Sequence, residues 1–188
     1  VCVVTASYNS AHTLPRACES LRRQTFQNWR HVIVDDGSTD ATPHLLAELS
    51  RDPRVTVIRQ ANAGQGAALN AGLRHVSAEF IAFLDDDDVW LPGHVRPHIA
   101  FLDAHPDHDA VFGQIVTADE NLTPITTPWP DRLPEDGDVF HHMLQGYFPQ
   151  VGATLMRRKM LDTYGLMDET LIGDSDWDWQ LRVARNHK

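Results

Sequence analysis

The sequence predicts one α/β domain, with a mostly parallel sheet and helices on both of its faces. Two observations predict it. Short continuous apolar runs, typical of strands buried on both faces, alternate with segments whose apolar residues recur at helical spacing. The 188 residues, 42% of them apolar, also suffice for a domain with a sizeable core. Strand–helix alternation of this kind favours parallel strands joined by helical crossovers.

Residues 1–117 predict five strands that alternate with four helices. We expect the strands at 1–6, 31–34, 55–59, 80–84 and 110–117. The first helix shows one apolar face, formed by Leu14, Ala17, Cys18 and Leu21. The second helix is expected to have Thr42 as its N-cap, with Pro43 at the first helical position. The third covers 64–76, and the fourth follows Pro92.

The regular alternation ends near Ala118. Residues 118–137 contain four prolines and predict an ordered loop over the sheet. Further along we expect a helix at 139–144, a strand at 153–157, a helix at 158–164 and a last helix from near 175 to 185. The chain starts without Met and stops just after a helical pattern, so we expect a fragment of a longer protein.

Composition and charge exclude several classes of protein. The net charge of −10 argues against nucleic-acid binding, which needs clustered Lys and Arg. The longest apolar run is too short to span a membrane, and no signal peptide is visible. Cys2 and Cys18 are expected to be buried free thiols in a reducing compartment. We therefore expect a cytoplasmic protein, one that reaches the inner face of a membrane only through segments outside this sequence.

Three polar clusters directly follow predicted strands, at 6–9, 35–38 and 85–88. Because parallel strands end at the same edge of a sheet, the three clusters should meet there. The third consists of four consecutive Asp residues, whose mutual repulsion a divalent cation would relieve. We interpret it as a Mg²⁺ or Mn²⁺ site that also holds substrate phosphates, rather than as a solvated turn. Asp35 and Asp36 suit a turn as well as a ligand site.

Two further segments allow a functional and a purely structural interpretation. The Gly-containing stretch 62–70 opens a helix, where it either presents amides to a phosphate or only caps the helix. Near the end of the chain, Trp177 and Trp179 stand beside three carboxylates, a combination common where sugars are held. Ser175 and Asp178 have the spacing of a capping box, which explains both without a functional role.

At this point the sequence resembles a known family. The stretches VVTASYNSAHTLPRACESLRRQTFQNWRHVIVDDGSTDAT, NAGQGAALNAGL and FIAFLDDDDVWLPGHV look like a family 2 glycosyltransferase of the GT-A fold, which has a Rossmann-like sheet. The resemblance resumes at VGATLMRRKMLDTYGLMDETLIGDSDWDWQLRVA. It implies a single GT-A domain over 1–188, with a nucleotide-sugar-binding half at 1–117 and an acceptor-side half at 118–188.

The resemblance also implies roles for individual residues. The nucleotide would be contacted by five residues: Ala6 and Tyr8 at the base, Asp36 at the base or ribose, and Asp85 and Asp86 at the ribose. Asp87 would bind the Mn²⁺ or Mg²⁺ ion that bridges the diphosphate. Because Asp86 stands at the spacer of the family's D-x-D motif, the metal ligand within 85–88 stays open.

Asp176 falls on the family's acceptor-activating base. Ser175 replaces the Glu of the family's Glu-Asp pair, and Asp174 is an alternative base. One carboxylate base without a second, nucleophilic carboxylate suits a single displacement with inversion at the sugar. The expected reaction moves a sugar from a nucleotide-diphosphate donor, UDP-sugar above others, to an acceptor hydroxyl.

Two other functions compete with this interpretation. A binding or regulatory module would keep the nucleotide and metal site but lack catalysis. A sugar nucleotidyltransferase also uses a metal-binding Asp, but the first strand–helix turn lacks the Gly- and Arg-rich, Lys-containing loop of that class. The presence of Asp176 favours the transferase.

Overall fold

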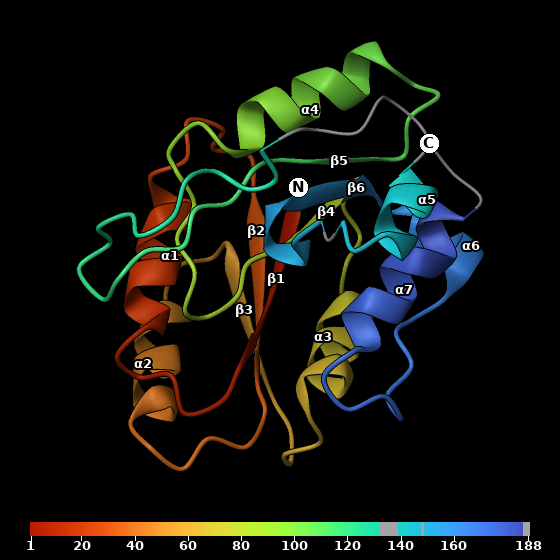
Figure 1. Cartoon of the computed structure of the whole chain (residues 1–188). Helices are drawn as coiled ribbons and strands as arrows, with labels where there is room; N and C mark the ends of the chain where they lie inside the picture. Colours follow the sequence, from red (N-terminus) through yellow and green to blue (C-terminus); the bar gives the residue numbers. More distant parts are fainter. Residues whose placement is uncertain (132–138, 148, 186–188) are drawn as a thin grey trace.

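The computed structural model describes residues 1–131, 139–147 and 149–185. Within them the strands form one sheet in the order β3-β2-β1-β4-β6-β5 (Figure 1). The strands are β1 (Cys2–Ser7), β2 (Arg30–Asp35), β3 (Val55–Arg59), β4 (Phe80–Phe83), β5 (Ala110–Phe112) and β6 (Thr154–Arg157). The β1, β2, β3 and β4 strands run parallel, whereas β6 pairs antiparallel with both β4 and β5. The expected mostly parallel sheet is confirmed.

The helices cover both faces of the sheet (Figure 1). They are α1 (Leu14–Arg22), α2 (Thr42–Leu49), α3 (Gln65–Leu73), α4 (Val95–Ala104), α5 (Val139–Leu144), α6 (Lys159–Tyr164) and α7 (Ser175–Ala184). Because successive strand residues point to opposite faces, Val3 packs with α1 and α4, whereas Val4 packs with α3, α6 and α7. The core therefore has two layers, one on each side of β1 and β4.

Hydrogen bonds at Thr5 join β1 to both of its neighbouring strands in the middle of the sheet. The Thr5 hydroxyl donates to the carbonyl oxygen of Leu84 at 2.6 Å, and it lies 2.9 Å from Nε2 of His31. Because the hydroxyl proton is used on Leu84, Nε2 of His31 must be the protonated nitrogen that donates to Thr5. Burial lowers the pKa of His31 to about 3, so the ring stays neutral. These contacts join β1, β2 and the end of β4.

The strand expected at 110–117 ends at Phe112. Its partner β6 begins at Thr154, opposite Phe112, and one further hydrogen bond joins the amide of Gly113 to the carbonyl oxygen of Ala153 at 3.0 Å. Residues 113–131 instead leave the sheet as an irregular excursion with isolated bridges between Ile115 and Trp129 and between Ala118 and Pro124. The described part of the expected Pro-rich loop, 118–131, belongs to this excursion, and 132–137 lie outside the described residues.

Two predicted helix caps do not form. Thr42 is the first helical residue rather than the N-cap, and its amide donates to Oδ1 of Asp40 at 2.9 Å. Ser175 likewise begins α7, after Asp174 as N-cap, and no side chain caps the helix. The capping box does not form because the Ser175 side chain is buried against α3, where a Cβ on Gly66 would lie 2.6 Å from its Oγ.

The expectation for the two cysteines holds. Cys2 and Cys18 are buried free thiols, and burial raises the pKa of each to about 11. Over the described residues, no helix has the length and apolar character that crossing a bilayer requires.

Candidate active site

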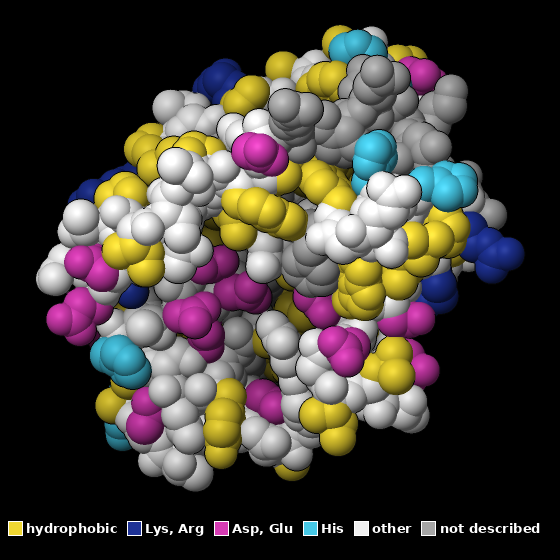
Figure 2. Space-filling view, viewed as in Figure 1, with side chains coloured by type: hydrophobic (Ala, Val, Ile, Leu, Met, Phe, Trp, Pro, Cys, Tyr) yellow, Lys and Arg dark blue, Asp and Glu magenta, His cyan; other side chains and the backbone are white. Residues whose placement is uncertain are grey.

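The three polar clusters do meet at one edge of the sheet. The amide of Asp36 donates to the carbonyl oxygen of Ser7 at 2.9 Å, which joins the ends of β1 and β2. The carboxylate of Asp86 accepts from the amide of Tyr8 at 3.3 Å and from the hydroxyl of Ser10, which joins the ends of β1 and β4. Figure 2 shows acidic side chains gathered around a hollow near the middle of this face.

Asp85 and Asp88 face the start of β6. A Cβ on Gly152 would lie 3.2 Å from Oδ2 of Asp88, a tight contact, and 3.8 Å from Oδ2 of Asp85, an ordinary van der Waals contact. The indole of Trp90 donates to the carbonyl oxygen of Gly152 at 2.7 Å and holds that backbone in place. Trp90 and Gly152, which are distant in sequence, thus form one wall of the acidic cluster, by which we mean Asp85–Asp88.

The acidic cluster carries charge that the protein itself leaves largely uncompensated. Burial, followed by repulsion from Asp88, Asp87, Asp86 and Asp176, raises the pKa of Asp85 to about 7. The pKa values of Asp86 and Asp88 are also raised, again by burial first. Asp87 is exposed at the tip of this turn.

These carboxylates fit a hard divalent cation, which prefers oxygen ligands. Among the described residues, no group of three or more His, Cys, Asp or Glu side chains is arranged to hold a metal alone. Mg²⁺ is commonly bound by one or two carboxylates together with substrate phosphates and water, so a full protein cage is not required.

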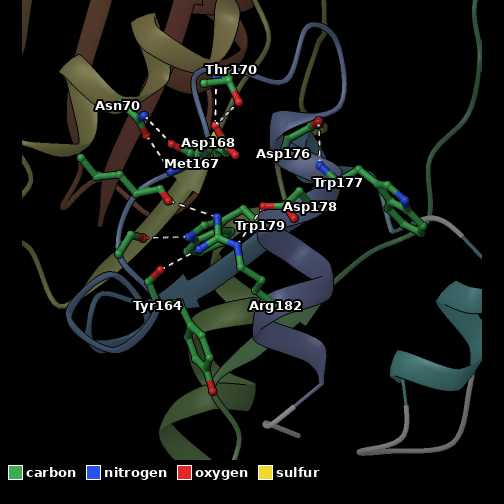
Figure 3. Close-up of polar contacts among 12 residues, drawn as sticks. Asn70, Tyr164, Met167, Asp168, Thr170, Asp176, Trp177, Asp178, Trp179 and Arg182 are labelled. Atoms are coloured by element: carbon green, nitrogen blue, oxygen red, sulfur yellow. Dashed lines mark hydrogen bonds and ion pairs between the residues drawn. The ribbon is translucent and has the colours of Figure 1, made fainter.

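Asp176 lies in the first turn of α7, and its charge acts on the acidic cluster. Its Oδ1 accepts a hydrogen bond from the amide of Trp177 at 2.8 Å (Figure 3). The side chain is half-buried, and its repulsion is one of the causes that raise the pKa of Asp85. Asp174 is exposed, and Asp178 forms an ion pair with Arg182 at 2.8 Å. Of the three neighbouring acids, Asp176 alone is among the causes of the Asp85 shift.

The α7 helix is anchored by Trp179 and Arg182 (Figure 3). The Trp179 indole donates to the carbonyl oxygen of Gly165 at 2.9 Å, and the guanidinium of Arg182 donates to the carbonyl oxygens of Tyr164 and Leu166 at 2.7 and 3.1 Å. Only 1% of Trp179 is exposed. Trp179 is therefore a core residue rather than a sugar-stacking one, and Trp177, which is half-buried, is the tryptophan of the pair still able to contact a sugar.

Asn70 of α3 fixes the segment that leads into α7. Its side-chain amide donates to the carbonyl oxygen of Met167 at 2.9 Å and accepts from the amide of Met167 at 2.9 Å. The same amide donates to Glu169 at 2.9 Å. Sequence reasoning missed this role. The signal that could have revealed it is the presence of a polar residue at the end of the apolar stretch Ala67-Ala68-Leu69, which is buried together with Asn70.

Asp36 has a structural task at the edge of the sheet. Its Oδ1 accepts from the side chain of Gln60 at 2.7 Å and from the amide of Ala63 at 2.9 Å, and its Oδ2 accepts from the amide of Gly64 at 2.9 Å. The carboxylate is buried and holds the loop that opens α3. Its expected contact with the base or ribose stays a prediction. Ala6 and Tyr8 lie at the same edge, where the Tyr8 ring is half exposed.

Comparison with protein-family models decides which family this arrangement represents. The model described as glycosyl transferase family 2 matches residues 2–165. The chain belongs to glycosyl transferase family 2.

About half of this chain is similar in sequence to named relatives. It is 45% identical over 105 residues to the succinoglycan biosynthesis protein ExoO of Rhizobium meliloti, covering 55% of this chain and 30% of that protein. It is 35% identical over 103 residues to an Escherichia coli protein, the UDP-Glc:alpha-D-GlcNAc-diphosphoundecaprenol beta-1,3-glucosyltransferase WfgD, covering 54% of this chain and 40% of that protein. The chain thus matches less than half the length of either relative.

Solved structures show the same fold. Residues 1–349 of Staphylococcus aureus TarS match with a TM-score of 0.76 and 23% identity, over 93% of this chain and 52% of that one. TarS bound to UDP-GlcNAc matches with a TM-score of 0.69 and 22% identity, over 89% and 48% of the two chains. A Pyrobaculum calidifontis mannosyltransferase in complex with GDP-Man and Mn²⁺ matches with a TM-score of 0.68 and 21% identity, over 93% and 49%. The GT-A fold expected from the resemblance is confirmed.

Proposed function

We propose that this domain transfers a sugar from a UDP-sugar donor to an acceptor hydroxyl, with a divalent cation and with inversion at the sugar carbon. The observation that supports it best is the position of Asp176, whose carboxylate acts electrostatically on Asp85 in the acidic cluster. A cation-binding cluster and an acid of the acceptor half then face one reaction site.

The nucleotide is proposed to lie along the ends of β1 and β4. The half-exposed ring of Tyr8 offers a flat apolar surface to a base, with Ala6 beside it. Asp86 contacts the amide of Tyr8, and Asp85 precedes it in the chain, so both are proposed for the ribose hydroxyls, while the exposed Asp87 suits Mn²⁺ or Mg²⁺. When bound, that cation neutralises the charge that develops on the departing diphosphate. The UDP-GlcNAc and GDP-Man complexes of the structural neighbours support a nucleotide-sugar donor.

Asp176 is proposed as the general base. Its carboxylate takes the proton of the acceptor hydroxyl as the hydroxyl oxygen bonds to the anomeric carbon and the bond to the diphosphate oxygen breaks. Attack from the face opposite the leaving group inverts that carbon. The protonated Asp176 returns its proton to water after the product leaves. The N-terminal end of α7 and the hydrogen bond from the amide of Trp177 orient the carboxylate for this task.

The test separates donor binding from transfer. Titration calorimetry with UDP should show binding with Mn²⁺ or Mg²⁺ and a large loss in EDTA, because the diphosphate otherwise meets like charge at 85–88. Asp176→Asn should keep this binding and lose about 10² to 10⁴ of the transfer or donor-hydrolysis rate. Asp174→Asn, two residues earlier and exposed, is the matched control and should keep full activity.

Other outcomes would assign the domain elsewhere. Metal-dependent UDP binding with no turnover of any UDP-sugar in the full-length protein would indicate the non-catalytic module. Release of pyrophosphate from UTP and a sugar phosphate would indicate the nucleotidyltransferase. Full activity in Asp176→Asn together with its loss in Asp174→Asn would move the base to Asp174.

A further inference from the structure

A recess lies between α5, α7 and the strands β5 and β6, and on α7 it begins one turn after Asp176. It is a partly open pocket with a cavity volume of about 70 Å³. Its walls are mainly apolar and include Phe112, Val139, Met143, Met156, Val183 and Ala184. One water needs on the order of 10–15 Å³ by this measure, so the pocket has room for a small substituent but not for a whole sugar ring.

One polar side chain in the pocket wall has no partner. Gln180 lines the pocket and is only 7% exposed. Within the part of the chain that the structure describes, neither its Nε2 nor its Oε1 has a hydrogen-bond partner. Buried amides are normally paired, and an unpaired one destabilises the fold unless a ligand or a water satisfies it.

Two segments, α7 and the chain that leads into β6, connect the proposed reaction site with the pocket. On α7, Gln180 follows Asp176 by four residues, so their side chains lie on the same face with Cβ atoms about 5–6 Å apart. On the sheet, Gly152 borders Asp85 and Asp88, and β6 begins two residues later at Thr154, which lines the pocket together with Met156. This spacing allows a molecule whose hydroxyl lies at Asp176 to place a neighbouring substituent near Gln180.

The lining specifies the chemistry of that substituent. The primary amide of Gln180 offers one carbonyl acceptor and two N–H donors and carries no charge. A secondary amide with a short alkyl group presents the matching N–H and C=O, and its methyl group suits the apolar wall. A free hydroxyl leaves the wall unfilled. Asp109, the carboxylate in the pocket wall, is buried and already paired with Lys159, so an added ammonium group would have to compete with that ion pair.

We propose that this pocket binds the acylamino group of an N-acylated amino-sugar acceptor, with Gln180 hydrogen-bonded to its amide. The accepting hydroxyl then lies on a ring position next to the acylamino group, because one turn of α7 separates Gln180 from Asp176. The assignment to an acceptor rests on the proposed transferase function. The preference for an acylamino group rests on the pocket alone.

The experiment compares sugars that differ only in this substituent. Saturation-transfer NMR measures binding of the methyl glycosides of N-acetylglucosamine, N-acetylgalactosamine, glucosamine, glucose and galactose, with UDP and Mg²⁺ present and absent. At least one N-acetyl sugar should bind about tenfold more tightly than its hydroxyl and amine counterparts, the gain expected from two satisfied hydrogen bonds. The acetyl methyl group should receive the strongest saturation.

Three variants locate the binding. Gln180→Met keeps the volume but removes both hydrogen bonds, so it should lose the preference, and it should melt no lower than the wild type because it removes an unpaired amide. Ala184→Leu fills the pocket and should abolish the preference. Gln145→Met makes the same chemical change at an exposed position and should retain it.

Each result decides the proposal. Equal binding of N-acetyl and hydroxyl sugars by folded wild type would overturn it, and so would a preference that persists in Gln180→Met or Ala184→Leu. UDP titration of the same samples separates this from the transferase assignment. A preference for N-acetyl sugars without metal-dependent UDP binding would refute the transferase and leave the pocket. UDP binding without the preference would refute the pocket alone.

Discussion

Replacing Asn70 by Ala should destabilise the domain severely, although within the described residues its side-chain hydrogen bonds go to Met167 and Glu169 and not to the acidic cluster or Asp176. Only 1% of Asn70 is exposed, and its side chain satisfies both the amide and the carbonyl of Met167. The variant leaves these two backbone groups unpaired, at about 1–3 kcal/mol each. It also loses the contact with Glu169. We therefore expect a loss of about 3–5 kcal/mol, a large part of the roughly 5–15 kcal/mol that stabilises a domain.

Urea unfolding followed by circular dichroism measures this loss, provided that the slope of the transition is unchanged. Asn28→Ala, at an exposed position, is the control and should change the unfolding free energy by less than about 0.5 kcal/mol. Asn70→Asp keeps the acceptor but loses the donor and faces Glu169, so it should also be destabilised. A loss below about 1 kcal/mol in Asn70→Ala would refute the view that this residue fastens the segment before α7.

Further predictions concern the acidic cluster, the centre of the sheet and the excursion at 113–131. In EDTA, Asp85→Asn should become more stable than the wild type as the pH rises from 4 to 7, by up to about 1.4 kcal/mol per pH unit. The pKa of Asp85 is raised to about 7, so in this range the folded wild type still holds a proton that the unfolded chain has released. The wild type therefore loses stability with rising pH through this group, and the variant does not. The difference between the two proteins is the quantity to measure, since His31 and His94, with pKa values lowered to about 3, act in the opposite direction below pH 6.5 in both; a flat difference would contradict the assignment. Thr5→Val should cost about 1–3 kcal/mol in urea unfolding because the buried N–H of His31 loses its acceptor, and a neutral result would show that this contact contributes nothing. Hydrogen exchange at 118–131 should slow when UDP and Mn²⁺ bind, as expected of an acceptor-side loop that orders with the donor; unchanged exchange would leave it a plain connection.

The sequence predicted those features that depend on local pattern. Apolar runs and helical spacing gave the alternation of strands and helices, and parallel topology correctly placed the clusters at 6–9, 35–38 and 85–88 at one edge. Errors arose where a distant residue competes for the same group. Ser175 fails to cap α7 because Gly66 allows α3 to approach it, and β5 stops at Phe112 because β6 begins opposite it.

The roles of Asn70, Trp179 and Gln180 were missed for the same reason: each depends on contacts with distant residues. Asn70 and Met167 are separated by 97 positions, and the tasks of Trp179 and Gln180 depend on which side of α7 meets the core and which meets α5. Nothing in the local sequence distinguishes a Gln that lines a pocket from one on the surface. Residue type and spacing therefore predicted which polar clusters meet at the edge of the sheet, whereas the roles of residues on α3 and α7 depend on contacts between distant parts of the chain.

The contact between Asn70 and Met167 also bears on how the chain is made. During synthesis the parallel strands β1 to β4 and the helix α3 emerge well before Met167, so they can pair early, while the α3 side of the sheet still lacks α6 and α7. In that interval Leu69, Leu73 and Phe83 face water without their later partners Met160 and Trp179. A chain stopped before residue 167 should therefore aggregate, and it should also lack Asp176. Packing of α7 against α3 and formation of the proposed reaction site thus coincide, so a chain stopped there lacks the proposed base.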